Sequence, residues 1–309
     1  MFRKIQAFQF FSILSLIFIL PTTDALAEEY NRSAKLTQYT FEAGYLQQLS
    51  ADIDSGGDFS VDRFFLQAGF KHSFNQKLFA GLSIGGGQDN YDFSGSSGLG
   101  GLNPWSKINT VRISAPILYN PEGSWSYLVI PSLRFNYEND ASMSESQTWG
   151  MLAGASYRIT DSLSIGPGIG VFSQLEDKTN IFPILIIDWR ITPNLSLETG
   201  RGFAATQGPG LQLRWDISDK WTLAAGGRYE KNRFRLDKQG IAQNGIGEDK
   251  SIPLFATAQY KISPRSSISG LVGMDVDGSL RLENEDGDRI DKSDYDTAPL
   301  LALIFKLRL

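Results

Sequence analysis

The feature that most constrains this chain is an alternating pattern between residues 211 and 229. Apolar residues occupy every second position before and after a short polar step at 218–220. Period two on both sides of a short turn predicts an antiparallel β-hairpin. One face of this hairpin is apolar and ends in aromatics, and the other is small or charged. A soluble sheet and a membrane barrel both show this pattern, so the rest of the chain must decide between them.

The breaks between alternating segments come in two kinds, which follow one another along the chain. The short breaks lie at 75–77, 120–123, 160–162, 192–194, 218–220 and 263–265, and the longer ones at 51–58, 93–104, 139–145, 237–250 and 284–293, with brief ones near 177–180 and 205–208. A barrel that crosses a membrane has tight turns at one end and long loops at the other, whereas a soluble sandwich has no reason to sort its connections.

The sequence therefore predicts an all-β fold, a transmembrane antiparallel up-and-down β-barrel of about fourteen strands. Twelve or sixteen strands remain possible if one hairpin is missed or split. The expected strands are 36–50, 59–74, 77–92, 105–119, 124–138, 146–159, 163–176, 180–191, 195–204, 209–217, 221–236, 251–262, 266–282 and 294–309. We expect bulges at Pro131 and Pro183, because each lacks a ladder donor. A bulge, or emergence from the bilayer, would explain why Phe234 and Leu236 carry the apolar face after Tyr229.

The first residues predict an export signal. Arg3 and Lys4 precede an apolar run at 8–20, and Ala25-Leu26-Ala27 has the small-x-small form of a cleavage site. We expect a signal peptide at 1–27 and a barrel at 28–309, with a retained N-terminal anchor as the alternative. No apolar stretch after residue 27 is long enough for a transmembrane helix.

Composition excludes several classes of function. The chain has no cysteine, which rules out disulfides and thiol chemistry and weakens any metal site. Its formal net charge of −5 argues against nucleic-acid binding. The glycine runs at 85–87 and 98–101 precede no predicted helix, so they do not predict a phosphate-binding loop. We expect no cofactor.

Charged residues on the predicted inward faces form two groups. A lumen charge network is expected from the eighth to the eleventh strand, comprising Asp188, Arg190, Glu198, Arg214, Asp216, Arg228 and Glu230. A basic wall is expected from the second to the sixth strand, comprising Arg63, Lys71, Arg112, Arg134 and Arg158. The network can select solutes by charge, or it can brace the wall by pairing, which its balance of acids and bases favours. The basic wall predicts that an open pore would prefer anions.

Aromatic residues near the short turns predict a girdle at the membrane interface, because their amphipathic rings suit the headgroup level. They are Tyr119, Trp125, Tyr157, Trp189, Trp215, Trp221 and Tyr260. The expected partners are outer-membrane lipids and lipopolysaccharide. The last strand ends on apolar Leu309 and partly resembles the signal that barrel assembly machinery recognises, in which the usual terminal residue is Phe.

Residues 164–237 carry a family resemblance, through GPGIGVFSQLED (166–177), FPILIIDWRITPNLSLETGRG (182–202), GPGLQLRWDISDKW (208–221) and GGRYEKNRFRLD (226–237). These stretches are similar to a family of Gram-negative outer-membrane barrel proteins catalogued as a domain of unknown function. The resemblance covers about a quarter of the chain. It implies a barrel at the outer membrane and no established substrate.

Catalysis and metal binding have weak sequence support. His72 is the only histidine, and its neighbour Ser73 would point to the opposite face of the strand. The acidic stretch 283–296 lacks the ligand order of a calcium loop, and a solvated loop is favoured. The sequence thus predicts a non-enzymatic barrel, a passive channel for small hydrophilic solutes. The alternatives are a closed structural or surface-binding barrel and, less favoured, a lipid-modifying enzyme.

Overall fold

The computed structural model describes residues 37–176, 178–199 and 210–309, and the predicted signal peptide at 1–27 lies outside these residues. Strands make up nearly all of the described chain. They are β1 (Thr37–Asp52), β2 (Asp58–Ser73), β3 (Leu78–Ser94), β4 (Lys107–Ser114), β5 (Ile117–Tyr119), β6 (Trp125–Glu138), β7 (Gln147–Thr160), β8 (Leu163–Ser173), β9 (Thr179–Thr192), β10 (Leu195–Thr199), β11 (Gly210–Asp216), β12 (Trp221–Arg228), β13 (Glu230–Arg235), β14 (Ile246–Lys261), β15 (Ser266–Glu283), β16 (Arg289–Tyr295) and β17 (Ala298–Arg308). The two short helices are α1 (Gly98–Leu102) and the 3₁₀ turn η2 (Ser144–Ser146).

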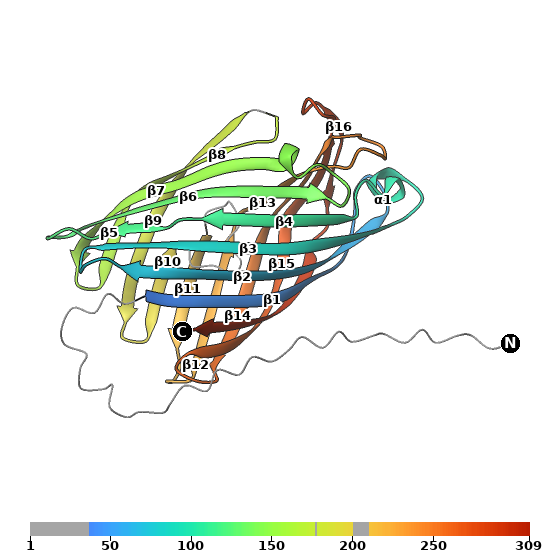
Figure 1. Cartoon of the computed structure of the whole chain (residues 1–309). Coiled ribbons are helices and arrows are strands. Elements are labelled where there is room, and N and C mark those ends of the chain that lie inside the picture. Colours follow the sequence, from blue (N-terminus) through green and yellow to red (C-terminus); the bar gives the residue numbers. More distant parts are fainter. Residues whose placement is uncertain (1–36, 177, 200–209) are drawn as a thin grey trace, which may run out of the picture. The chain divides into compact units, whose positions relative to one another are not determined.

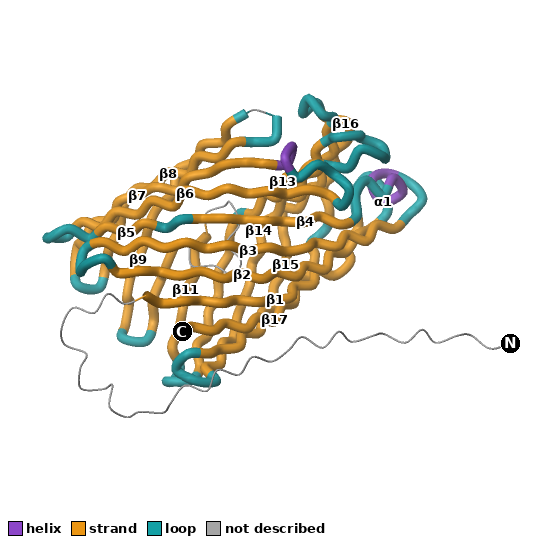
Figure 2. Tube along the Cα trace, viewed as in Figure 1, coloured by secondary structure: helices purple, strands orange, loops and turns teal. Residues whose placement is uncertain are grey.

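These strands form one sheet that closes on itself (Figures 1 and 2). Strands that are adjacent around the wall pair antiparallel, and β1 closes the sheet by pairing with both β2 and β17. Three pairs, β4 with β5, β12 with β13 and β16 with β17, each cross the wall as one interrupted strand. The result is a closed fourteen-strand antiparallel barrel, which confirms the predicted fold.

The barrel has two unlike ends. The connections after β2, β5, β7, β9, β11 and β14 are short, and we call their side the turn end. The opposite side, the loop end, carries α1, η2 and the loop before β14. Among the described residues, no helix is long and apolar enough to cross a membrane.

The expected bulges at Pro131 and Pro183 are not present. Pro131 pairs with Met151 and Pro183 with Ile169, and neither pairing carries a register shift. The carbonyl oxygen of Pro131 accepts a hydrogen bond from the amide of Ala115 at 3.0 Å. The backbone N–H that proline lacks would point to the same side, toward the interruption between β4 and β5. The lost hydrogen bond therefore falls where the neighbouring strand is interrupted, and no extra residue is needed in β6.

Strand β13 leaves the regular order of the wall. One edge pairs with β14, and the other edge contacts β6 in parallel at Arg235 and Tyr137, across the interior. The register with β14 is the same before and after Tyr229, so the expected bulge is wrong here too. Phe234 and Leu236 simply continue the inward face and are 0% and 2% exposed.

The outer surface of the barrel is apolar, and the interior is mixed. Many large apolar side chains on outward positions are exposed, including Phe64 at 48%, Ile84 at 53% and Val272 at 59%. Buried residues form one large apolar cluster at the loop end and a small one beside it, formed by Leu46, Phe255, Leu271 and Leu300. An exposed apolar exterior around a partly polar interior is the arrangement of a barrel with lipid outside.

Candidate functional site: the charged interior

A layer of seven charged side chains lies inside the barrel, and we call it the charge layer. Its members are Arg63, Asp89, Arg112, Arg134, Arg228, Glu230 and Asp249. They come from seven strands, β2, β3, β4, β6, β12, β13 and β14, and the alternation of each strand directs them inward. They line a cavity of about 140 Å³. Four arginines against three carboxylates leave this lining with one excess positive charge.

Asp249 organises one side of the charge layer. Its carboxylate accepts hydrogen bonds from Arg63 Nη2 at 3.0 Å, from the hydroxyl of Tyr91 at 2.8 Å and from the hydroxyl of Tyr295 at 3.2 Å. Arg63 also lies 3.7 Å from Asp89, which faces it in register on β3. Asp249 is 4% exposed. These contacts compensate the burial of its charge.

The other side of the charge layer is dominated by arginines. Arg112 and Arg134 are direct register partners on β4 and β6, and both face inward. Arg228 forms an ion pair with Glu230 through Nη2. Its Nε and Nη1 are buried with no hydrogen-bond partner among the described residues. Three arginines from β4, β6 and the end of β12 thus lie on this side with one carboxylate, Glu230, from the start of β13.

The structure distributes the predicted lumen charge network over two levels. Arg228 and Glu230 belong to the charge layer. The other five lie nearer the turn end: Arg214 bonds Asp216 at 2.7 Å, Asp188 faces Glu198, and Arg190 faces Ser196. Asp188 and Arg190 are exposed to solvent. The contacts among the described residues thus do not join these seven into a single network.

The predicted basic wall is likewise divided. Arg63, Arg112 and Arg134 are in the charge layer. Lys71 and Arg158 lie near the turn end, where the Lys71 ammonium sits 4.6 Å from the centre of the Phe79 ring and Arg158 is exposed. Sequence analysis missed Asp89 and Asp249 as their counter-charges. The inward parity of β3 could have revealed Asp89, whereas Asp249 fell inside a predicted loop.

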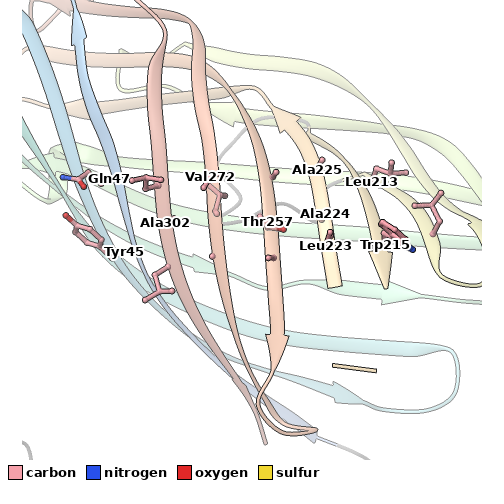
Figure 3. Close-up of a pocket in the computed structure, with 17 residues that line it drawn as sticks. Tyr45, Gln47, Leu213, Trp215, Leu223, Ala224, Ala225, Thr257, Val272 and Ala302 are labelled. Carbon is pink, nitrogen blue, oxygen red and sulfur yellow. The ribbon is translucent and has the colours of Figure 1, made fainter. Parts of the chain in front are cut away.

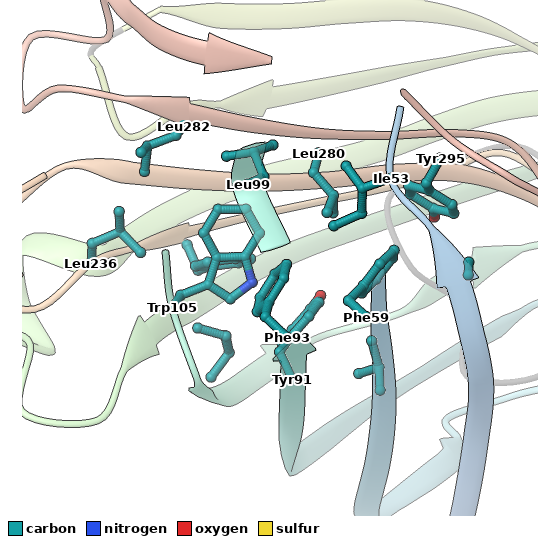
Figure 4. Close-up of a cluster of buried hydrophobic side chains, with 14 of the residues drawn as sticks. Ile53, Phe59, Tyr91, Phe93, Leu99, Trp105, Leu236, Leu280, Leu282 and Tyr295 are labelled. Carbon is teal, nitrogen blue, oxygen red and sulfur yellow. The ribbon is translucent and has the colours of Figure 1, made fainter. Parts of the chain in front are cut away.

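An apolar cluster fills the interior at the loop end, and we call it the apolar cap (Figure 4). It comprises Ala51, Ile53, Phe59, Val61, Tyr91, Phe93, Leu99, Trp105, Ile108, Phe234, Leu236, Ala242, Leu280, Leu282, Tyr295 and Ala298. Each is at most 9% exposed. Trp105 is central: its ring lies 5.2 Å from that of Phe234 and 5.5 Å from that of Phe93. Strands from opposite parts of the wall meet here, so the cap closes this part of the loop end.

The glycine run at 98–101 allows α1 to pack closely against its neighbours beside the apolar cap. Gly98 has φ +58°, and a Cβ there would lie 2.2 Å from the carbonyl oxygen of Ser55. A Cβ on Gly100 would lie 2.4 Å from the oxygen of Ser94. Only glycine permits this close approach of α1 to the β1–β2 loop. The packing places Leu99 in the cap with no exposed surface.

A third charged group is buried near the loop end and was not predicted. Arg233 pairs with Glu176 at 2.8 Å, with Glu283 at 2.6 Å and with Glu248. Glu283 is 1% exposed, and residues Arg289–Tyr295 form strand β16. The expected loop at 283–296 is therefore strand for half of its length, whereas most of its residues are exposed to solvent as expected. No group of three potential metal ligands occurs among the described residues.

Toward the loop end, the inner face of β8 and β9 carries two aromatic rings. Phe172 and Phe182 stack with ring centres 5.8 Å apart. Each ring lies over an inward glycine of the preceding strand, Gly150 and Gly170 respectively, where a Cβ would come within about 2.4 Å of the ring. The glycines thus make room for rings inside the barrel.

The predicted interface aromatics lie on the outer surface at the turn end. Trp125 faces Tyr157 with ring centres 5.1 Å apart, and Trp221 faces Tyr260 at 4.9 Å. Tyr119, Trp189 and Trp215 are exposed at 45%, 40% and 51%. His72 also faces outward here, with Nδ1 2.7 Å from the hydroxyl of Thr37.

An apolar groove of about 820 Å³ runs along the outer face of β12, β14 and β15 (Figure 3). Its floor is formed by small residues such as Ala225, Ala256 and Gly270, and larger ones such as Trp215 and Leu303 flank it. Small side chains lower the floor between taller neighbours. The groove belongs to the same apolar exterior as the exposed side chains above.

Comparisons with known proteins return structural likeness only. No family model and no curated protein matches the chain. Three solved structures are similar to it: an outer membrane channel from Pseudomonas putida F1 (10% identity, 90% of this chain and 97% of that chain covered, TM-score 0.49), the toluene transporter TodX from P. putida (8%, 88% and 89%, 0.44) and the translocator domain of the autotransporter NalP from Neisseria meningitidis (12%, 91% and 90%, 0.39). At these values they identify neither a family nor an activity, and membership in the uncharacterised family stays a prediction.

Proposed function

We propose that this chain is an outer-membrane β-barrel that acts as a channel for small hydrophilic solutes, with the charge layer as its constriction. The observation that carries this proposal is the buried set of charges around a cavity inside a barrel with an apolar exterior. Charges are expensive to bury, so a wall that needed only filling would be served better by apolar packing. The wet charges near the turn end, such as Asp188 and Arg190, support a solvated entrance.

In this proposal the turn end faces the periplasm, and outer-membrane lipids and lipopolysaccharide surround the apolar exterior. Short turns on the periplasmic side are the rule for such barrels. The aromatics at the turn end then lie at the inner headgroup level. The C-terminal strand β17, which closes the barrel against β1, is the proposed signal for the barrel assembly machinery.

The excess of one positive charge in the charge layer predicts a preference for anions. The test is the reversal potential of the purified barrel in a planar bilayer under a potassium chloride gradient. We expect an anion-selective potential that moves toward zero in Arg134→Gln. Lys107→Gln removes an exposed charge on an outward position of β4 and serves as the matched control. A cation-selective wild-type barrel would contradict the proposed constriction.

A second candidate is a closed barrel with a structural or surface-binding role, and the apolar cap favours it. The cap buries sixteen side chains across the loop end. Water does not fill a tightly packed apolar space. If the wild-type barrel and a cap-weakened variant such as Trp105→Ala both fail to conduct, the closed barrel is the better proposal. An enzymatic role has no comparable support, because His72 faces outward with Thr37 as its hydrogen-bond partner.

A further inference from the structure

The apolar groove on the outer face of the wall crosses several neighbouring strands. It extends from Tyr45 on β1 to Trp215 on β11, with β17, β15, β14 and β12 between them (Figure 3). Its volume of about 820 Å³ falls within the range of about 300–1,000 Å³ that pockets for small molecules occupy. Among the described residues, no charged side chain lines it. The groove is therefore large enough for a ligand and suited to an apolar one.

The floor of the groove is low at a position where the wall does not require it. A Cβ on Gly270 would have no neighbour within 4 Å, so a larger side chain would fit there without disturbing the wall. The register with Ala258 on β14 and Leu303 on β17 is regular, so a bulge does not explain this glycine. Glycine inside a strand weakens the strand and often marks the close approach of a ligand. Gly270 thus leaves a space that the packing of the barrel does not account for.

A second copy of the chain would not fill this groove by a symmetric contact. Two subunits related by a twofold axis present the same surface to each other. A concave surface placed against itself leaves its floor empty. The apolar exterior of the barrel continues into the groove, and this exterior is the arrangement of a wall with lipid outside. The group that fits is therefore a flexible acyl chain from the surrounding lipid.

The same strands carry an aromatic pair at the level where a lipid headgroup would lie. Trp221 and Tyr260 face each other on the outer face, with ring centres 4.9 Å apart. Such rings prefer the headgroup level of a bilayer. Ala256, on the floor of the groove, lies four residues further along β14, which is about 13 Å along a strand. The floor thus lies at the depth of acyl chains.

Positive charge lies at the turn end of these strands. Lys220 and Arg265 are exposed, and they lie in the β11–β12 turn and the β14–β15 turn. The amide of Lys261 donates a hydrogen bond to the carbonyl oxygen of Lys220 at 2.9 Å, which holds the first turn beside β14. Together with Asp219, the two turns carry one excess positive charge. Cations at this level attract anionic lipid headgroups.

We propose that the groove binds one phospholipid with an anionic headgroup. Its acyl chains lie over the small residues around Gly270, and its phosphate lies beside the Trp221–Tyr260 ring pair, near Lys220 and Arg265. The bound lipid completes the outer surface of the barrel where the wall is hollow. The proposal rests on the membrane placement of the barrel and is independent of conduction.

The test is native mass spectrometry of the folded, full-length mature barrel in nonionic detergent, with an equimolar mixture of phosphatidylglycerol and phosphatidylcholine. We expect one phosphatidylglycerol retained per barrel, in preference to phosphatidylcholine. Gly270→Leu should abolish this retention, because its side chain fills the floor without contacting the wall. Gly86→Leu is the matched control on β3: this glycine is also exposed, and a Cβ there would come no nearer than 3.5 Å to its neighbour. It should retain the lipid.

A change in the turn tests the headgroup without altering the groove. Lys220→Gln should weaken phosphatidylglycerol binding about fivefold, which is the contribution of one cation near an anionic lipid surface. Lys77→Gln removes an exposed lysine from the β2–β3 turn, away from the groove, and should leave the affinity unchanged. Titration of the lipid in the same spectrometric measurement gives both affinities.

The outcomes separate this proposal from its competitors. Heat-dependent mobility in gel electrophoresis verifies that each variant is folded. No lipid retained by the folded wild type, or equal retention by Gly270→Leu, would overturn the proposal. Equal affinity of Lys220→Gln and wild type would overturn the anionic headgroup, and oligomers that disappear in Gly270→Leu would assign the groove to a second copy instead. Because conductance is not the readout, a barrel that fails as a channel can still pass this test.

Discussion

Arg112 and Arg134 are direct register partners on β4 and β6, and both face the interior of the barrel. This pairing of like charges sets the sign of the first prediction. Arg134→Met should raise the free energy of unfolding by about 1 kcal/mol, because Arg134 is 8% exposed and its repulsion by Arg112 is replaced by apolar contact. Guanidinium titration of the vesicle-inserted barrel, followed by tryptophan fluorescence, measures this. Clear destabilisation would show that Arg134 is already compensated.

Substitution of Asp249 should lower the free energy of unfolding of the barrel. It accepts hydrogen bonds from Arg63, Tyr91 and Tyr295. Asp249→Ala therefore leaves two hydroxyls buried without a partner, and it leaves Arg63 with only the more distant carboxylate of Asp89 at 3.7 Å. We expect a loss of about 3–5 kcal/mol in the free energy of unfolding. The same guanidinium titration measures it, and Asp286→Ala, in the β15–β16 turn, is a control without such contacts. A loss below about 1 kcal/mol would mean that water reaches these groups.

The apolar cap should control conductance at the loop end. Trp105 is 2% exposed and contacts the rings of Tyr91, Phe93 and Phe234. Trp105→Ala should lower the free energy of unfolding by about 3–5 kcal/mol and increase single-channel conductance, because the cap loses its central side chain. Trp221→Ala removes an exposed tryptophan on the outer surface and should leave conductance unchanged. Equal conductance of Trp105→Ala and wild type would place the passage away from the cap.

The two faces of β8 should tolerate charge differently. Ile169 is outward and 43% exposed, whereas Ser164 is inward and faces Asp188. Ile169→Arg should cost up to about 2–4 kcal/mol if it lies near the membrane midplane, because the charge would enter lipid. Ser164→Arg should cost little, since it can pair with Asp188 in a solvated lumen. Folding yields and unfolding titrations in lipid vesicles compare the two, and equal costs would contradict the lipid-facing assignment.

Substitutions of Gly98 and Gly123 should distinguish the energetic cost of close packing from the cost of backbone strain. Both have positive φ, but a Cβ on Gly98 would meet the Ser55 oxygen at 2.2 Å, whereas a Cβ on Gly123 has no neighbour within 4 Å. Gly123→Ala should cost about 1 kcal/mol from strain alone. Gly98→Ala should cost clearly more, because α1 must move away from the β1–β2 loop. Unfolding titrations of both variants measure the difference, and similar costs would mean that the loop adjusts freely.

Most of the barrel could be predicted from local pattern. Alternation identifies a strand and its two faces without knowledge of its neighbours, and turn residues mark where it ends. The expected strands therefore agree with the structure within a few residues for most of the chain. The errors occur where a partner strand changes the outcome. Pro131 needs no bulge because β4 and β5 are interrupted beside it, and Asp249 lies in a strand because β15 extends far enough to pair with it.

The candidate site shows the same division. The sequence by itself determined that Arg63, Arg112 and Arg134 face the interior, because inward orientation follows from strand parity and from the cost of charge in lipid. Only the tertiary structure decided which charges meet. Strand β13 pairs with β14 on one edge and contacts β6 on the other. Arg228 and Glu230 thereby line one cavity with the arginines of β4 and β6, and Phe234 packs against Trp105. No local pattern encodes that contact, because it depends on how the closed sheet bends around its interior.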